Sequence, residues 1–308
     1  MARKSKAKRQ HYVPRLYLVR FGRLLYVFDK KTGKTFSSTP SNIALESGFY
    51  DLAPEIDLEG LIAKNEARLN PGLSELVVKG DPTAISTEAR AKVSLFIALQ
   101  YIRTREARLS IQEMAGKFLT AVVNEEPRFK GHGFKVTMDE EAAQAMQATA
   151  IVDDTVPKLA SFIDGSLWVL LINESTIPFW TSDNPVALFN PIDYGTAGGL
   201  GFGAKGIQTH FPLSSDLSLV ILDPTSYKSL PIMSARERVV LEENERQLYN
   251  ATRFVFSSKN DFALAKRLWE NDKSLREPHA RVSVHVSKGE RGTLFQTSSL
   301  PSRPLGKK

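Results

Sequence analysis

The chain contains no cysteine and no long hydrophobic run. Without cysteine, disulfides, thiolate-zinc sites and a cysteine nucleophile are all excluded, as is common in a reducing compartment. The longest apolar run, residues 167–172, is far shorter than the roughly 20 residues that cross a bilayer. The beginning of the sequence also lacks the apolar stretch of a secretory signal, because arginines interrupt its hydrophobic residues. We therefore expect a cytoplasmic protein without a membrane span.

Acidic residues are also absent from the first 28 positions. The whole chain has 41 basic and 34 acidic residues, so beyond these positions 33 basic residues face 34 acidic ones. The net positive charge therefore belongs to the start of the chain. We predict that residues 1–10 form a disordered basic arm that attracts nucleic acid, attached to a nearly neutral body. The basic residues concerned are Arg3, Lys4, Lys6, Lys8, Arg9, Arg15, Arg20 and Arg23.

Hydrophobic periodicity predicts an α+β fold, in which a helical block packs on a small, mostly antiparallel sheet. We expect a single domain over residues 11–290, with a mainly helical subregion at 11–165, a strand-rich and then helical subregion at 166–290, and a disordered tail at 291–308. The expected strands are 24–28 and 35–37 in a hairpin, 167–172 paired with 178–181, 217–222, and 281–286. The expected helices are a short turn at 41–46, 55–70 ended by Pro71 and Gly72, 87–123 with a bend or break, 139–163 disturbed at Pro157, and helices within 234–269.

The segment Gln10-His11-Tyr12-Val13-Pro14 sits among the basic residues. His11 titrates near neutral pH, so it could transfer a proton or contact a phosphate. The alternative interpretation is structural: Tyr12, Val13 and Pro14 fix the entry of the chain, and His11 makes local hydrogen bonds.

The helical segment 100–105 carries Gln100, Arg103 and Arg105. The two arginines diverge by about 200° around a helix, so one of them should point inward. An inward guanidinium cannot deprotonate and must meet an anion. That anion could be a substrate phosphate or an internal acid such as Glu46 or Glu66.

Short polar side chains follow one another at Thr181-Ser182-Asp183-Asn184-Pro185. Such a sequence is typical of a turn in which Asp and Asn bind backbone amides. A functional alternative places Asp183 at a strand end as an orienting carboxylate, with Ser182 and Asn184 holding a substrate oxygen.

Other patterns give weaker predictions. The glycine-rich segment 195–206 matches neither the phosphate-loop nor the dinucleotide template, so it is a surface loop or a lid. His210 is interpreted as structural, and Asp29-Lys30-Lys31 as a solvated hairpin turn. The histidines lack the spacing of a metal site, so we expect no metal and no cofactor.

Several of these motifs occur together in an order that resembles a bacterial domain-of-unknown-function family, DUF4238. The resemblance covers residues 8–258, and the family has no established activity. It therefore implies one domain and no reaction. The motifs are residues 10–14, 25–30, 41–44, Glu46, 48–50, Arg103-Thr104 and 181–185.

These observations lead to two functional hypotheses. The first is a metal-independent enzyme acting on nucleic acid or another phosphate-bearing substrate, such as a nuclease of bacterial defence or toxin type. Its catalytic residues would be His11, Arg103 and Asp183, and its substrate-binding residues would be Gln100, Arg105, Ser182 and Asn184. The second is a non-enzymatic module that binds nucleic acid or protein.

Overall fold

The computed structural model describes residues 9–51, 57–192, 194, 199–276, 280–289 and 292–300. Within them the α+β class is confirmed, with helices beside several small and mostly antiparallel sheets. Most of the predicted basic arm, residues 1–8, lies outside the described residues, as does part of the glycine-rich segment. The described chain begins at Arg9 and enters strand β1 (Gln10–His11), which pairs with β4 (Leu45–Glu46).

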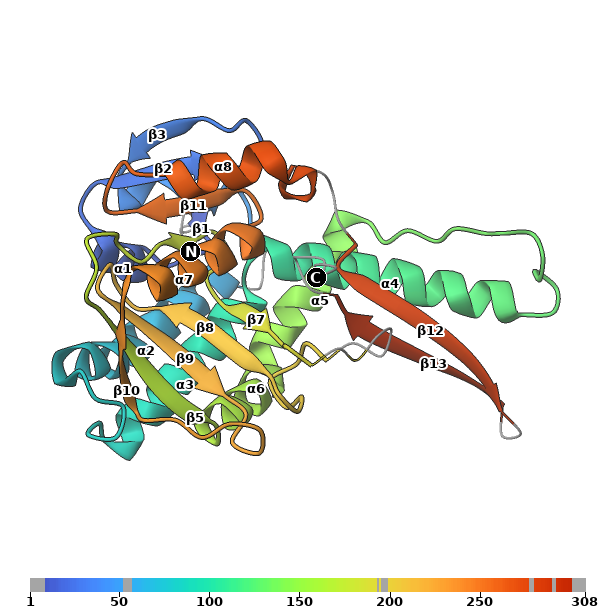
Figure 1. Ribbon diagram of the computed structural model, residues 1–308. Helices are drawn as coiled ribbons and strands as arrows, with labels where there is room; N and C mark the ends of the chain where they lie inside the picture. Colours follow the sequence, from blue (N-terminus) through green and yellow to red (C-terminus); the bar gives the residue numbers. More distant parts are fainter. Residues whose placement is uncertain are drawn as a thin grey trace, which may run out of the picture.

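The larger sheet has two buried faces. Its strand order is β10-β5-β9-β8-β7, and only the β10–β5 pair is parallel. Along β5, Trp168 and Leu170 join the main core, whereas Val169 and Leu171 face the opposite side with Val240 of α7. The sheet therefore lies between α7 and the helical block (Figure 1). The elements are β5 (Leu167–Asn173), β7 (Ala187–Phe189), β8 (Gln208–Pro212), β9 (Leu217–Leu222), β10 (Ile232–Ala235) and α7 (Glu237–Asn250).

A second sheet joins segments that are far apart in the sequence. Its order is β3-β2-β11-β6, all antiparallel. The predicted hairpin is confirmed as β2 (Leu25–Asp29) and β3 (Thr35–Ser38), and β2 pairs with β11 (Phe254–Ser257). The far edge is β6 (Thr181–Ser182), and α8 (Ala263–Asn271) packs on the outer face. The prediction that residues 178–181 pair with β5 is therefore wrong, because β6 pairs with β11 in this second sheet.

The helical block differs from prediction at one proline. Helix α2 (Leu58–Lys79) continues through Pro71 and Gly72. Leu69 before them and Leu73 and Leu76 after them are all buried in the core, and this burial requires the helix to continue. Tertiary burial here outweighs the local helix-breaking signal. The helix ends instead at Gly80, whose φ of +61° suits a left-handed C-cap that binds the Leu76 carbonyl.

The long predicted helix after Ser86 breaks, as expected. It forms α3 (Thr87–Ile102) and α4 (Arg105–Glu125), with the break at Arg103 and Thr104. Thr104 stops one helix and starts the next, since its hydroxyl accepts a bond from the Ala107 amide and acts as an N-cap. The helical region predicted at 139–163 likewise divides into α5 (Glu140–Val152) and α6 (Thr155–Asp164), with Pro157 in the first turn of α6, where no amide is needed.

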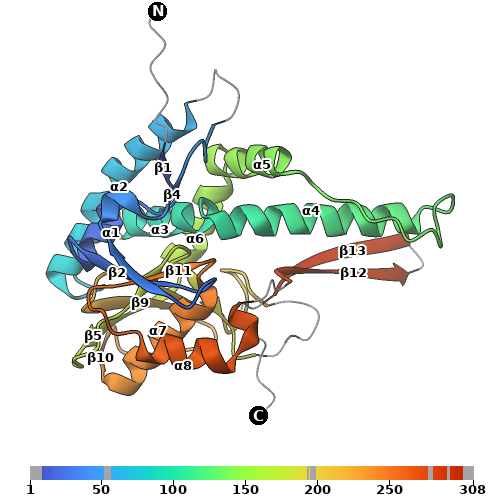
Figure 2. The same cartoon turned by 90° about the horizontal axis from the view of Figure 1, so that it is seen from above.

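Part of the molecule projects from this body. The distal half of α4 extends away from the sheets, flanked by the hairpin β12 (Val282–Gly289) and β13 (Gly292–Ser299) and by the connection to α5 (Figures 1 and 2). The strand expected at 281–286 is confirmed. The disordered tail expected at 291–308 is wrong for 292–299, which pair with β12 in register from Val282 opposite Ser299.

Two short segments also differ from expectation. The helical turn predicted at 41–46 ends early, as a 3-10 turn η2 (Pro40–Asn42), because Leu45 and Glu46 extend to pair with β1. The region predicted as helices over 234–269 contains β10 and β11 as well as α7 and α8. The remaining short elements are α1 (Arg15–Leu18), η1 (Val19–Phe21) and η4 (Lys273–Leu275).

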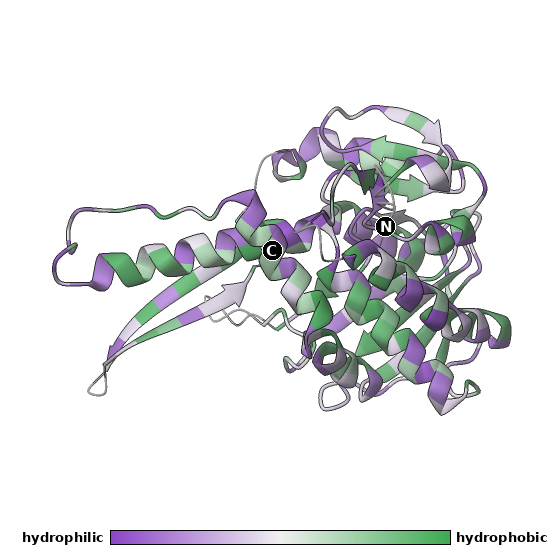
Figure 3. Ribbon diagram, turned by 180° about the vertical axis from the view of Figure 1, so that it is seen from behind, coloured by the Kyte–Doolittle hydropathy of each residue, from purple (hydrophilic) through white to green (hydrophobic). Residues whose placement is uncertain are grey.

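Hydrophobic residues gather in the strands and helices of the body, whereas the projecting part alternates between hydrophobic and hydrophilic residues (Figure 3). Within the described ranges, no helix combines the length and the apolar character that a membrane crossing requires.

The crossing of α2 and α3 gives a test of the packing. A Cβ on Gly72 would lie 2.7 Å from the Ala89 carbonyl oxygen and 2.7 Å from the Lys92 Cβ. Gly72→Ala should therefore lower the free energy of unfolding by about 1–3 kcal/mol, measured by urea denaturation, although alanine is the better helix former. As a control, Ala63→Leu on the exposed side of the same helix should change it by less than about 0.5 kcal/mol.

Candidate functional site

Arg103 lies buried at the break between α3 and α4, with 2 % of its surface exposed. Its Nε donates to the Tyr50 hydroxyl at 2.9 Å, and its two terminal nitrogens donate to the Glu66 carboxylate and to the His11 carbonyl oxygen. The guanidinium therefore ties together the N-terminal strand, the segment before α2, and α2 itself. Its charge is matched inside the protein by Glu66.

The prediction that one of the two arginines points inward is confirmed. Arg103 is the inward one, whereas Arg105 is half-exposed and pairs with Glu46 at the surface. Each arginine thus meets one of the two acids that the sequence suggested. Gln100 lies on the buried face of α3, where its amide nitrogen donates to the Tyr12 carbonyl at 3.2 Å.

His11 is joined to Arg103 through its backbone and not through its ring. The imidazole Nε2 donates to the Pro40 carbonyl at 3.2 Å. Burial lowers the pKa of His11, although the Pro40 bond and the Glu66 charge act in the opposite direction. A neutral, half-buried ring bonded to the main chain is suited to fixing the chain entry.

Asp183 lies in a separate hydrogen-bond network. Its two carboxylate oxygens accept bonds from the amides of Thr252, Arg253 and Phe254 at 2.8–2.9 Å. Burial raises the pKa of Asp183 to about 6, outweighing these amide bonds and the nearby Lys30 charge. The carboxylate orients the connection between α7 and β11. No bond to a histidine is among its hydrogen bonds in the described residues.

Ser182 and Asn184 also bind α7. The Ser182 hydroxyl donates to Gln247, which in turn donates to the Pro185 carbonyl. Asn184 and Asn250 exchange bonds between side chain and main chain, at 3.0 and 2.5 Å. The polar turn at 181–185 is therefore held by residues spaced three apart on one face of α7.

Lys30 is buried, which the sequence did not predict. It is only 5 % exposed, although the sequence predicted a solvated turn. Its Nζ donates to the carbonyls of Ala251 at 2.5 Å and Tyr249 at 3.4 Å, at the C-terminal end of α7. Burial lowers the pKa of Lys30 to about 8, while the Asp183 and Glu106 charges act to raise it. Only its position at the end of an apolar strand could have signalled this burial.

The motif side chains thus divide into two groups. His11 and Arg103 meet Tyr50 and Glu66, whereas Asp183 is close enough to Lys30 and Tyr12 for its charge to shift their pKa values. Burial raises the pKa of Tyr12, and Asp183 adds to that effect. In the hydrogen bonds of the described residues, the two groups share no partner.

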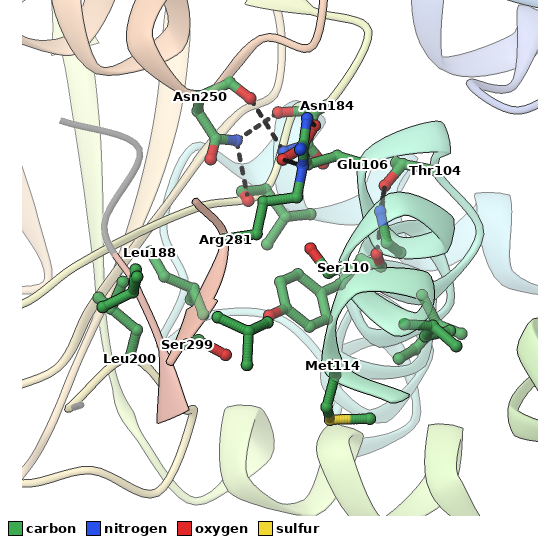
Figure 4. A pocket seen from close by; sticks show the side chains of 17 residues that line it. Thr104, Glu106, Ser110, Met114, Asn184, Leu188, Leu200, Asn250, Arg281 and Ser299 are labelled. Atoms are coloured by element: carbon green, nitrogen blue, oxygen red, sulfur yellow. Dashed lines mark hydrogen bonds and ion pairs between the residues drawn. The ribbon is translucent and has the colours of Figure 1, made fainter. Parts of the chain in front are cut away.

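A cavity of about 200 Å³ lies beside these motifs (Figure 4). Thr104 and Asn184 reach it from two motifs that are far apart in the sequence. Glu106 and Arg281 form an ion pair at its wall at 2.5 Å, and Thr252 donates to Glu106 at 3.2 Å. The remainder of the wall is mostly apolar, with side chains such as Met114, Leu188, Val186, Leu200 and Val282.

The other predicted features have structural partners. His210 is buried beneath α7, with Nδ1 3.0 Å from Glu243 and Nε2 3.3 Å from Gln208. In the glycine-rich segment, Asn190 donates to the carbonyls of Gly199 and Lys205, which fixes that part to β7. No cluster of three or more histidine, aspartate or glutamate side chains in the described ranges is arranged to hold a metal ion.

The two arginines permit a matched comparison. Arg103→Lys keeps the buried charge but removes the fork that reaches three partners, so unfolding should become easier by about 3 kcal/mol. Arg105→Lys changes an exposed pair and should alter stability by less than about 0.5 kcal/mol. Urea denaturation measures both, and equal effects would contradict the assigned framework role of Arg103.

Asp183→Asn tests the hydrogen-bond network around Asp183, because the side-chain nitrogen of asparagine would face backbone amides that also donate. At pH 7 the substitution should lower the free energy of unfolding by about 2–3 kcal/mol. The folded pKa of Asp183, about 6, lies above its ordinary value of 3.8, so the folded state holds this proton more tightly. The wild type therefore loses stability relative to Asp183→Asn as pH rises from about 4 to about 6, by up to about 3 kcal/mol.

Denaturation at pH 4, 5, 6 and 7 measures this difference. The exposed Asp216→Asn is the control and should show no such trend. A difference between wild type and Asp183→Asn that is independent of pH would contradict the raised pKa.

Comparison with known proteins identifies the family of the chain. No curated protein and no solved structure matches it. A family model described as a protein of unknown function, DUF4238, matches residues 9–261, a range that holds both motif networks but ends before α8 and the β12–β13 hairpin. The chain belongs to the DUF4238 family.

Proposed function

We propose that this protein binds nucleic acid without cleaving it, and that its motif residues form the framework that holds the basic N-terminal segment to the body. The observation that carries this proposal is the engagement of the expected catalytic groups. Arg103 has three internal partners and Asp183 has three backbone donors, so neither is free to act on a substrate.

The anchoring of the basic segment supports the same role. Directly after Arg9, the Gln10 side chain donates to Asp51 and accepts from the Tyr50 amide. Arg103 then holds the next carbonyl, that of His11. A polyanion that binds the preceding lysines and arginines is thereby coupled to the folded body.

A hydrolase is the second candidate, and the cavity in Figure 4 supports it. Thr104 and Asn184 both line this cavity, as do Glu106 and Arg281. The Arg281 guanidinium already pairs with Glu106, so a small phosphate-bearing group would bind at this wall by replacing that carboxylate as the partner of Arg281. A nuclease of bacterial defence or toxin type would be one setting for such a site.

Neutralising the segment tests the proposal. The triple substitution Lys4→Gln, Lys6→Gln and Lys8→Gln should weaken binding to labelled RNA or DNA and reduce the slope of log affinity against log salt by about 2–3. Fluorescence anisotropy at several salt concentrations measures both. The control Lys64→Gln, Lys228→Gln and Lys266→Gln removes the same charge from exposed positions of the body and should leave the slope within about 1 of wild type.

A cleavage assay decides between a binding protein and a hydrolase. We expect RNA and DNA substrates to remain intact with wild type in the presence of Mg²⁺. Cleavage by wild type that disappears in Glu106→Gln would favour the hydrolase instead. Equal salt slopes for both triple variants would remove the role of the basic segment.

A further inference from the structure

The connection between α4 and α5 forms the tip of the projecting part (Figures 1 and 2). Residues 127–135 are all exposed, and the family motifs do not include them. Their sequence is Pro-Arg-Phe-Lys-Gly-His-Gly-Phe-Lys, in which aromatic and basic side chains alternate. We call residues 127–135 the tip.

Two phenylalanine rings are exposed on the tip. Phe129 is 40 % exposed and Phe134 is 46 % exposed. Their ring centroids lie 5.5 Å apart with the planes nearly perpendicular, and His132 lies 5.8 Å from Phe134. The three rings form one partly exposed cluster, and the Arg128 guanidinium lies 6.0 Å from the centroid of the Phe129 ring.

The charge of the tip has one sign. Arg128, Lys130 and Lys135 are basic, and no acidic residue occurs between Glu126 and Asp139. Glu126 pairs with Arg128, so Lys130 and Lys135 supply most of the attraction for an anion. Next to the tip, Lys288 of β12 pairs with Glu125.

Hydrogen bonds from α4 hold the tip in place. Asn124 donates to the Phe134 carbonyl at 2.9 Å and accepts from its amide at 3.0 Å. Further along, the Val136 amide donates to the Thr120 hydroxyl at 2.9 Å. The rings are therefore positioned before any partner arrives, which reduces the ordering entropy that binding requires.

From these observations we propose that the tip is a binding surface for single-stranded nucleic acid. Unpaired bases stack on Phe129, His132 and Phe134, while Lys130 and Lys135 contact the phosphates. This inference rests on the proposed function, because it names the form of nucleic acid and adds a second contact to the basic N-terminal segment.

The chemistry of the tip itself favours a nucleic acid over a lipid surface. Leu119 and Val122 are exposed on α4 before it, but residues 127–135 contain no aliphatic side chain larger than proline, and their apolar groups are rings that pack edge to face. Insertion into a bilayer generally relies on a broad apolar face with leucine or tryptophan. A duplex hides its base faces, so stacking on these rings requires unpaired bases.

The test compares the full-length protein with a variant that keeps apolar side chains on the tip but removes their aromatic faces. Phe129→Leu with Phe134→Leu should weaken binding to labelled oligo(dT) and oligo(U) of about twenty nucleotides by about tenfold or more. Binding to a duplex of the same length should stay within about twofold. Fluorescence anisotropy gives the affinities, and circular dichroism checks the fold.

Two further variants complete the design. Phe118→Leu removes an aromatic ring that packs on Phe295 away from the tip, and should leave single-strand affinity unchanged. Lys130→Gln with Lys135→Gln should lower the salt slope for single strands by about 1–1.5.

Unchanged single-strand affinity in the double leucine variant would overturn the inference, as would equal losses for single strands and duplex. Phenylalanine-dependent binding to vesicles of phosphatidylserine and phosphatidylcholine, with no effect on oligonucleotides, would identify a membrane surface instead. The lysine variants of the N-terminal segment test the proposed function separately. If they bind normally while the leucine variant does not, the tip surface stands and the role of the segment falls.

Discussion

The buried charge of Arg103 constrains how three segments of the N-terminal half of the molecule are arranged around the end of α3. A guanidinium removed from water must have an anion and acceptors in fixed positions, and here Glu66, Tyr50 and the His11 carbonyl supply them. Each partner comes from a different segment. Arg103 therefore links the positions of three features: strand β1, the segment before α2, and the break between α3 and α4. Displacing any of them would leave the buried charge of Arg103 without one of its partners.

A second constraint acts on the connection between α7 and β11. Lys30 binds carbonyls at the end of α7, and Asp183 binds the amides of the next three residues. The Lys30 ammonium donates to main-chain carbonyls, and the Asp183 carboxylate accepts from main-chain amides. The direction of the main chain therefore determines where the basic and the acidic side chain lie. Motifs that resemble catalytic elements in the sequence here complete the hydrogen bonding of an irregular buried segment.

The sequence was informative where structure is local. The turn after Asp29 predicted the hairpin, and the spacing of buried residues predicted α3 and the β5 and β9 strands. Helix geometry also predicted that one of the two arginines points inward, but it left open whether its partner is a phosphate, Glu46 or Glu66, and the structure pairs Arg103 with Glu66. The hairpin, the helix and the strands depend on neighbouring residues. The buried arginine depends on a single requirement, which is that a guanidinium removed from water must meet an anion.

Features that depend on distant residues could not be predicted. Nothing near Phe254 indicates that this four-residue strand, lying between two helices, pairs with β2. The continuation of α2 through Pro71 depends on the core around Leu73 and Leu76, and the burial of Lys30 depends on carbonyls more than two hundred positions later. The role of Asp183 was open for the same reason, because its amide donors are remote in the sequence.

The pairing of β2 with β11 also has a consequence for synthesis of the protein. The ribosome releases the chain from its N-terminus, so the β2–β3 hairpin emerges long before Phe254–Ser257 can complete the sheet. During that interval the inner edge of β2 has unpaired amides and carbonyls beside apolar residues such as Val27 and Phe28. Contacts of such large sequence separation slow folding, so the open edge of the nascent hairpin needs protection from premature association until β11 is available.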